Sequence, residues 1–177
     1  KASSVIDSDP DVDILAKTVS VTLNGGSQQP FGTSSHPIGT SVTGTLSVVT
    51  NGSNQFITQG NSLGLLGLNL NAGTGNVTLT VTQGAVADTD SSDSITANIA
   101  TITLSDTSVR NFGASDNPIA TNVTSLSVDT SAGGGSQFID ELAGLTGLAL
   151  LAGGGDVTLT VGKLAVSDDD GDVDIAA

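Results

Sequence analysis

Three clusters of aspartate carry most of the charge of this 177-residue chain. Twelve of its seventeen aspartates fall in the segments 7–13, 88–93 and 168–174. Closely spaced carboxylates repel one another unless a cation lies between them, and Ca²⁺ takes roughly six to eight oxygen ligands. The sequence therefore predicts calcium sites whose candidate ligands are Asp7, Asp9, Asp11, Asp13, Asp88, Asp90, Asp168, Asp170, Asp172 and Asp174.

The calcium pattern is incomplete, and a second interpretation stays open. No glutamate closes a loop of the EF-hand type. In the middle cluster, Ser92 and Ser94 stand where the other clusters carry aspartate, so we expect this cluster to bind calcium most weakly. Alternatively, the aspartates cap bends, keep the surface soluble and protect sheet edges from pairing with other chains.

The remaining residue types offer little for catalysis. The chain has no cysteine and one histidine, His36, whose counterpart in a second copy of the same loop is Asn117. A zinc site or a Cys–His nucleophilic pair within this chain is therefore excluded. A polysaccharide lyase would need a basic residue beside carboxylates, and Arg110, Lys17 and Lys163 show no such convergent set. We expect no enzymatic activity.

The formal net charge of −14 narrows the choice of partners. Nucleic acids and anionic membranes are bound through lysine and arginine, of which this chain has four in total. No apolar run approaches the ~20 residues that span a bilayer. We therefore expect neither a nucleic-acid partner nor membrane insertion.

Internal repetition explains why the aspartate cluster occurs three times. The segment GNVTLTV at 75–81 returns as GDVTLTV at 155–161, and NQFI at 54–57 returns as SQFI at 136–139. Matching segments recur at offsets of about 80 residues, which is the sequence signature of a repeat protein. The chain divides into a first repeat, 1–81, a second repeat, 82–162, and the start of a third, 163–177.

Short alternating segments predict an all-β fold. VSVTL at 19–23 and VTLTV at 77–81 place aliphatic side chains on one face and hydroxyls on the other. Clusters of Gly, Asn and Ser between such segments are typical of turns. Two architectures fit: tandem immunoglobulin-like β-sandwiches, or a parallel β-solenoid in which both repeats form one stack. The short strands, the aliphatic filling and the absence of Trp and Tyr favour one continuous solenoid.

A resemblance to a known family points the same way. ITANIATITLSDTSVRNFGASDNPIATNVTSLSVDT, followed by GDVTLTV and DDDGDVDIAA, resembles the tandem repeats of filamentous-haemagglutinin-like bacterial surface adhesins. The resemblance covers essentially the whole chain. It implies a right-handed parallel β-helix on the cell surface, in proteins that serve as adhesins or matrix fibres. It implies no particular site residue.

These observations predict a structural, non-catalytic segment of an extracellular fibre or adhesin stalk, with calcium as its candidate stiffening ion. Because a solenoid leaves unpaired strand edges at its ends, the expected partners are adjoining repeats or identical copies stacked head to tail. A surface glycan or host receptor is a further candidate partner. The alternatives are a calcium-dependent array of immunoglobulin-like spacers and a polysaccharide-binding or polysaccharide-lyase β-helix.

Overall fold

The structure, a computed structural model, describes residues 4–24, 29–60, 68–88, 92, 94–168 and 171–177. The described residues form strands and no helix. None of them therefore belongs to a helix long and apolar enough to cross a membrane. The strands are β1 (Ile14–Ala16), β2 (Val19–Thr22), β3 (Ile38–Val42), β4 (Leu46–Val49), β5 (Gln55–Gln59), β6 (Leu68–Asn71), β7 (Val77–Val81), β8 (Ile95–Leu104), β9 (Ile119–Asp129), β10 (Gln137–Glu141), β11 (Gly147–Leu151), β12 (Val157–Val161) and β13 (Ile175–Ala176).

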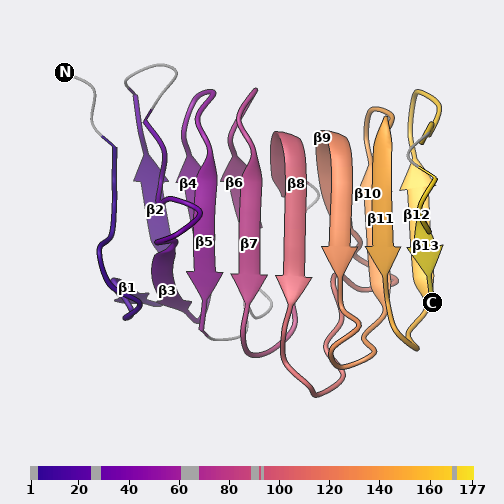
Figure 1. Cartoon of the computed structure of the whole chain (residues 1–177), viewed down its shortest axis with the longest axis horizontal. Helices are drawn as coiled ribbons and strands as arrows, with labels where there is room; N and C mark the ends of the chain where they lie inside the picture. Colours follow the sequence, from indigo (N-terminus) through magenta and orange to yellow (C-terminus); the bar gives the residue numbers. More distant parts are fainter. Residues whose placement is uncertain (1–3, 25–28, 61–67, 89–91, 93, 169–170) are drawn as a thin grey trace.

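The strands stack in two columns along the long axis of the molecule (Figure 1). Column 1 holds β1, β3, β5, β7, the second halves of β8 and β9, β11 and β13; column 2 holds β2, β4, β6, the first halves of β8 and β9, β10 and β12. These strand pairings are all parallel, and the chain makes about seven right-handed turns. The predicted β-solenoid is confirmed, and the alternative of tandem sandwiches is wrong.

One sequence repeat corresponds to three and a half turns of the solenoid. Three turns lead along column 1 from β3 through β5 and β7 to the second half of β8, and a further half turn leads to the first half of β9 in column 2. The first half of β9, at Ile119, is the counterpart of β3, at Ile38. Equivalent segments of the two repeats therefore lie on opposite sides of the stack.

The interior is a set of aliphatic ladders rather than a core around aromatic residues. Each inward side chain lies directly over the inward side chain of the paired strand in the next turn. The two strands are about 4.8 Å apart, which is the usual spacing of paired strands. One ladder in column 1 runs through six turns in strict register: Ile38, Ile57, Leu79, Ile102, Val128, Leu150 and Ile175. These side chains are fully or almost fully buried except at the C-terminal end, where Ile175 is 48% exposed.

Polar side chains also enter the interior, and they do so at equivalent places in both repeats. In the first repeat, the Thr40 hydroxyl donates to Gln59 Oε1 at 2.7 Å, and Gln59 Nε2 donates to the Val42 carbonyl at 2.9 Å. In the second, the Thr121 hydroxyl donates to Glu141 Oε2, also at 2.7 Å. Because buried polar groups are costly without partners, these pairs fix the register of the turns that carry them.

The tight turns are stacked by side-chain to backbone hydrogen bonds. Asn54 Oδ1 accepts the Asn76 N–H of the next turn at 2.9 Å, and Asn111 Oδ1 accepts the Ser136 N–H at the same distance. At Gly75 an added Cβ would lie 2.5 Å from the Ser53 carbonyl oxygen. Glycine at this position therefore lets successive turns approach closely.

A shared interior predicts unequal effects for the same mutation in the two repeats. Leu79→Ala removes a fully buried side chain from the middle of the stack and should cost roughly 2–5 kcal/mol of unfolding free energy. Its counterpart Leu159→Ala, on half-buried β12, should cost clearly less. Denaturant unfolding of the two variants measures the difference. Equal losses would contradict a shared interior, because sandwiches with separate cores would bury both leucines alike.

Candidate functional site

The first aspartate cluster lies in the N-terminal arm, which we define as residues 4–16. Asp7 Oδ1 accepts the backbone N–H groups of Ser8 at 2.6 Å and Asp9 at 3.2 Å, and Asp9 Oδ1 accepts that of Asp11 at 3.1 Å. These are the short-range bonds by which aspartate stabilises bends. Two of the predicted calcium ligands, Asp7 and Asp9, therefore shape the backbone of their own segment through their carboxylates.

Asp13 instead ties the arm to the next turn. Its Oδ2 accepts the Gly39 N–H at 2.7 Å, while its own N–H donates to the Gly39 carbonyl at 2.8 Å. The arm passes so close here that a Cβ at Gly39 would lie 2.2 Å from the Asp11 carbonyl oxygen. Glycine at position 39 is thus the contact point between the arm and β3.

The other two clusters also make structural bonds. Asp88 is only 4% exposed and accepts a short hydrogen bond from the Ser94 hydroxyl. In the third cluster, Asp168 Oδ2 accepts the Leu148 N–H at 3.1 Å, and the Asp174 carbonyl accepts the Leu150 N–H at 2.7 Å. Asp172 is exposed to solvent. The predicted ligands Asp90 and Asp170 lie outside the described residues.

The half turn in the repeat separates the clusters in space. The first and third clusters lead into column 1 at Ile14 and Ile175, whereas the middle cluster leads into column 2 at Ile95. Among the residues that the structure describes, no three carboxylate or histidine side chains come together in a group that could hold a metal. Calcium binding by these clusters stays a prediction.

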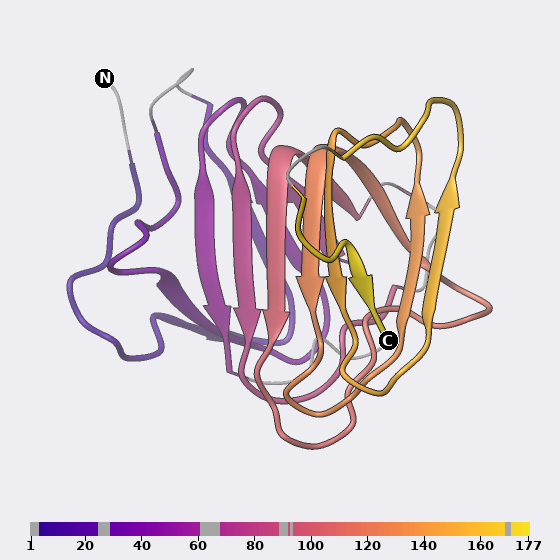
Figure 2. The ribbon, with the colours of Figure 1, turned by 45° about the vertical axis from the view of Figure 1, so that its right-hand side comes forward.

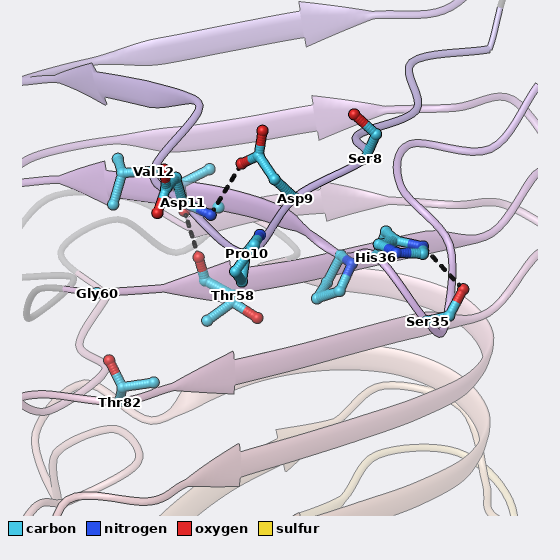
Figure 3. A pocket seen from close by; sticks show the side chains of 13 residues that line it. Ser8, Asp9, Pro10, Asp11, Val12, Ser35, His36, Thr58, Gly60 and Thr82 are labelled. Atoms are coloured by element: carbon cyan, nitrogen blue, oxygen red, sulfur yellow. Dashed lines mark hydrogen bonds between the residues drawn. The ribbon is translucent and has the colours of Figure 1, made fainter.

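A cavity of about 570 Å³ lies beneath the arm (Figure 3). Residues 8–12 of the arm line it, together with the loop that carries His36 and outward side chains such as Thr58 and Thr82. The His36 ring lies 3.1 Å from the Ser35 hydroxyl, and the His36 N–H donates to the Thr33 hydroxyl at the same distance. His36 is thus held within its own loop. The cavity marks where the arm stands away from the stack.

Arg110, one of the basic residues considered for a lyase site, stabilises a turn. Its Nε donates to Asp106 Oδ2 at 2.8 Å, and Asp106 also accepts the N–H groups of Ser108 at 2.9 Å and Gly84 at 3.1 Å. The Ser108 N–H, the Arg110 guanidinium and the Gly84 N–H hold the pKa of Asp106 well below its usual range. The guanidinium is therefore occupied within its own turn.

The two ends of the stack are surfaces that sequence reasoning expected but did not map (Figure 2). At the C-terminal end, inward residues of β12 are half-buried, whereas their counterparts in β7 are fully buried. Val5 and Val166 are 38% and 41% exposed, whereas Val86, at the equivalent place inside the stack, is fully buried. Inward side chains are therefore more exposed in the first and last turns of the described chain than in its middle.

The Asp106 turn gives a pH-dependent prediction. A carboxyl whose pKa is lowered by folding stabilises the protein above its ordinary pKa, and this contribution is lost as the pH falls through the acid range. Asp106→Asn should therefore lower the melting temperature at pH 7, with a difference from wild type that shrinks as the pH falls below about 4. Asp116→Asn, in an exposed loop, is the control and should show no comparable pattern. A constant difference at every pH would contradict the assignment.

Calcium binding can be measured directly by thermal melting with calcium and with EDTA. A bound ion should raise the melting temperature by mass action, and Asp172→Asn, which removes an exposed carboxylate, should reduce that rise. If the wild-type melting temperature does not depend on calcium, the calcium hypothesis is wrong and the aspartates serve as bend caps and solubilising charges.

Comparison of the chain with models of protein families, with curated proteins and with solved structures finds no match.

Proposed function

We propose that this chain is a structural, non-catalytic segment of an extracellular fibre or adhesin stalk, built for continuation end to end. The observation that carries the proposal is the pair of open ends, since the solenoid has the same two-column cross-section along its whole length. In the first and last turns, inward aliphatic side chains are only partly buried: Val21 and Leu23 at one end, Val157 and Leu159 at the other.

The lateral surface supports a spacer more than a catalyst. Outward positions of β7 and β12 carry threonine, and the aspartates of the first cluster bond mainly to nearby backbone. Because equivalent segments of successive repeats lie on opposite sides of the stack, outward threonines of β7 and β12 belong to different columns. The outward threonine row of column 1, formed by Thr58, Thr80 and Thr103, is therefore not continued by the threonines of β12.

The same proposal includes location at a bacterial cell surface, calcium as a stiffening ion, and a glycan or host receptor as partner. They are supported by the resemblance to adhesin repeats, by the acidic charge and by the exposed third cluster, in which Asp172 faces solvent. In this proposal the ends of the stack carry the assembly function, and the lateral clusters contribute solubility and ion binding.

The end surface can be tested with two aspartate substitutions on β12. Leu159→Asp places a charge on the inward, half-buried position and should prevent end-to-end growth, because a charge inside a stacked junction loses its hydration. Thr158→Asp adds the same charge on the exposed outward face and is the matched control. Rod lengths in electron micrographs, over a range of protein concentrations, provide the measurement. Wild-type particles that keep the length of one chain at every concentration would overturn the proposal.

A further inference from the structure

We propose that two copies of this chain join by strand exchange: the segment 163–177 of one copy replaces the N-terminal arm of the next. This inference rests on the proposed end-to-end function and specifies its junction. The two segments share one phase of the repeat, since 2–16 and 163–177 align without a gap and agree at eight of fifteen positions. Each segment ends with a short strand of column 1, β1 in one case and β13 in the other.

The first half of the junction already exists inside the chain. β12 is the counterpart of β7, and β2 is the counterpart of the second half of β8. Within the stack, Leu79 of β7 pairs with Ile102 of β8, and both are fully buried. The same register places Leu159 of one copy opposite Val21 of the next. This pairing would bury the inward residues of β12 and cover the free edge of β2.

At the second contact of the junction, two segments compete for the same edge of β3. Inside the stack, Ile95 pairs with Thr121. The counterpart of Thr121 is Thr40, which pairs in the structure with Ile14 of the arm. Ile175 of a neighbouring copy has the same phase as Ile14, so it would pair with the same Thr40. Because both segments need the same edge of β3, the arm has to leave when the neighbour docks.

The arm is held mainly by backbone hydrogen bonds, at Val5, Asp13 and Ala16, and buries few of its side chains. Its side chains are largely exposed, with Leu15 at 80%, Ile6 at 61% and Val12 at 56%, and β1 contains only three residues. The cavity of about 570 Å³ lies beneath residues 8–12, although the Asp11 carbonyl contacts Gly39. An arm with few buried side chains and a void beneath it loses little packing when it detaches.

The replacing segment gives up nothing in its own copy. Its bonds to the preceding turn, Leu150 N–H to the Asp174 carbonyl and Ala152 N–H to the Ala176 carbonyl, are both 2.7 Å long and use one edge of β13. The other edge remains for β3 of the next copy. Asp174 is also the counterpart of Asp13, whose carboxylate accepts the Gly39 N–H.

The exchange also preserves the column order. Two repeats of three and a half turns make seven whole turns, so column 1 of one copy continues into column 1 of the next. Equivalent segments of successive copies therefore lie on the same side of the stack, whereas equivalent segments of the two repeats within one chain lie on opposite sides. With paired strands about 4.8 Å apart, the exchanged fibre should have an axial subunit repeat of roughly 34 Å.

Locking the arm tests the exchange. The double variant Leu15→Cys/Ser41→Cys joins two residues that pair between β1 and β3, at a strand spacing that a disulfide can bridge. The chain has no cysteine of its own. Oxidised protein should fail to grow end to end, and reduction should restore growth. The matched control, Thr80→Cys/Thr103→Cys, joins paired strands in the middle of the stack and should grow in both states. Growth of the oxidised arm variant equal to that of its reduced form would overturn the exchange.

Deletion of residues 1–16 should act in the opposite direction. Without the competing arm, the concentration for half-maximal assembly should fall by about tenfold or more, equivalent to ~1.4 kcal/mol per junction. Sedimentation of the deleted and complete chains measures this shift. An unchanged or higher concentration, with the solenoid still folded by circular dichroism, would count against a competing arm.

Intermolecular cross-links separate failure of the exchange from failure of the fibre proposal. Chains carrying Thr160→Cys mixed with chains carrying Thr22→Cys should form disulfides wherever β12 stacks on β2. Chains carrying Ala176→Cys mixed with chains carrying Ser41→Cys should do so only after exchange. Both cross-links support the proposal. The first without the second overturns the exchange and leaves the fibre function standing, whereas absence of both overturns the two together.

Discussion

In-register stacking of parallel turns is the constraint on which the rest of this structure depends. Each inward residue has to fit the residue above and the residue below it at a spacing of about 4.8 Å. The ladder from Ile38 to Leu150 meets this condition with β-branched and leucine side chains alone. A narrow interior of this kind has little room for large rings, which accounts for a core that contains only two fully buried phenylalanines, Phe31 and Phe112, among the described residues. The same constraint places the buried polar pairs Thr40–Gln59 and Thr121–Glu141 on adjacent turns, where each satisfies the other.

One sequence repeat does not fill a whole number of turns, and this determines which residues share a side of the stack. A repeat that ends on a half turn returns to the same side of the stack only after two repeats, so the first and third aspartate clusters share a column that the second does not. Equivalent residues of successive repeats therefore alternate between the two sides of the rod. The two ends of the stack differ from its sides, because inward aliphatic side chains are partly exposed there. Physical asymmetry between sides and ends is therefore the strongest structural argument for a spacer that continues along its axis.

The candidate site was only partly predictable. The aspartate clusters are visible in the sequence as spacing, but spacing does not say which oxygen a carboxylate will bond. Asp7 and Asp9 are engaged by N–H groups of their own bend, and Asp13 by Gly39 of the next turn. The engagement of Arg110 by Asp106 was suggested by proximity along the chain, whereas the contribution of Gly84 required the preceding turn to be in place. The cavity beneath the arm had no sequence signal, because it is formed by segments that lie far apart in the chain.

The sequence by itself determined the class of the fold, since alternating residues predict strands, the offset of about 80 residues predicts repeats, and the absence of Trp and Tyr favours a narrow aliphatic interior. It also determined the phase of each segment, and hence which strands are equivalent. Only the tertiary structure decided how many turns fill one repeat, because turn lengths vary and the chain can close a coil after different numbers of residues. That number, three and a half, sets the side on which every cluster lies. It also decided that the arm occupies one edge of β3, because a pairing between strands that are not adjacent in the sequence exists only once the turns are stacked.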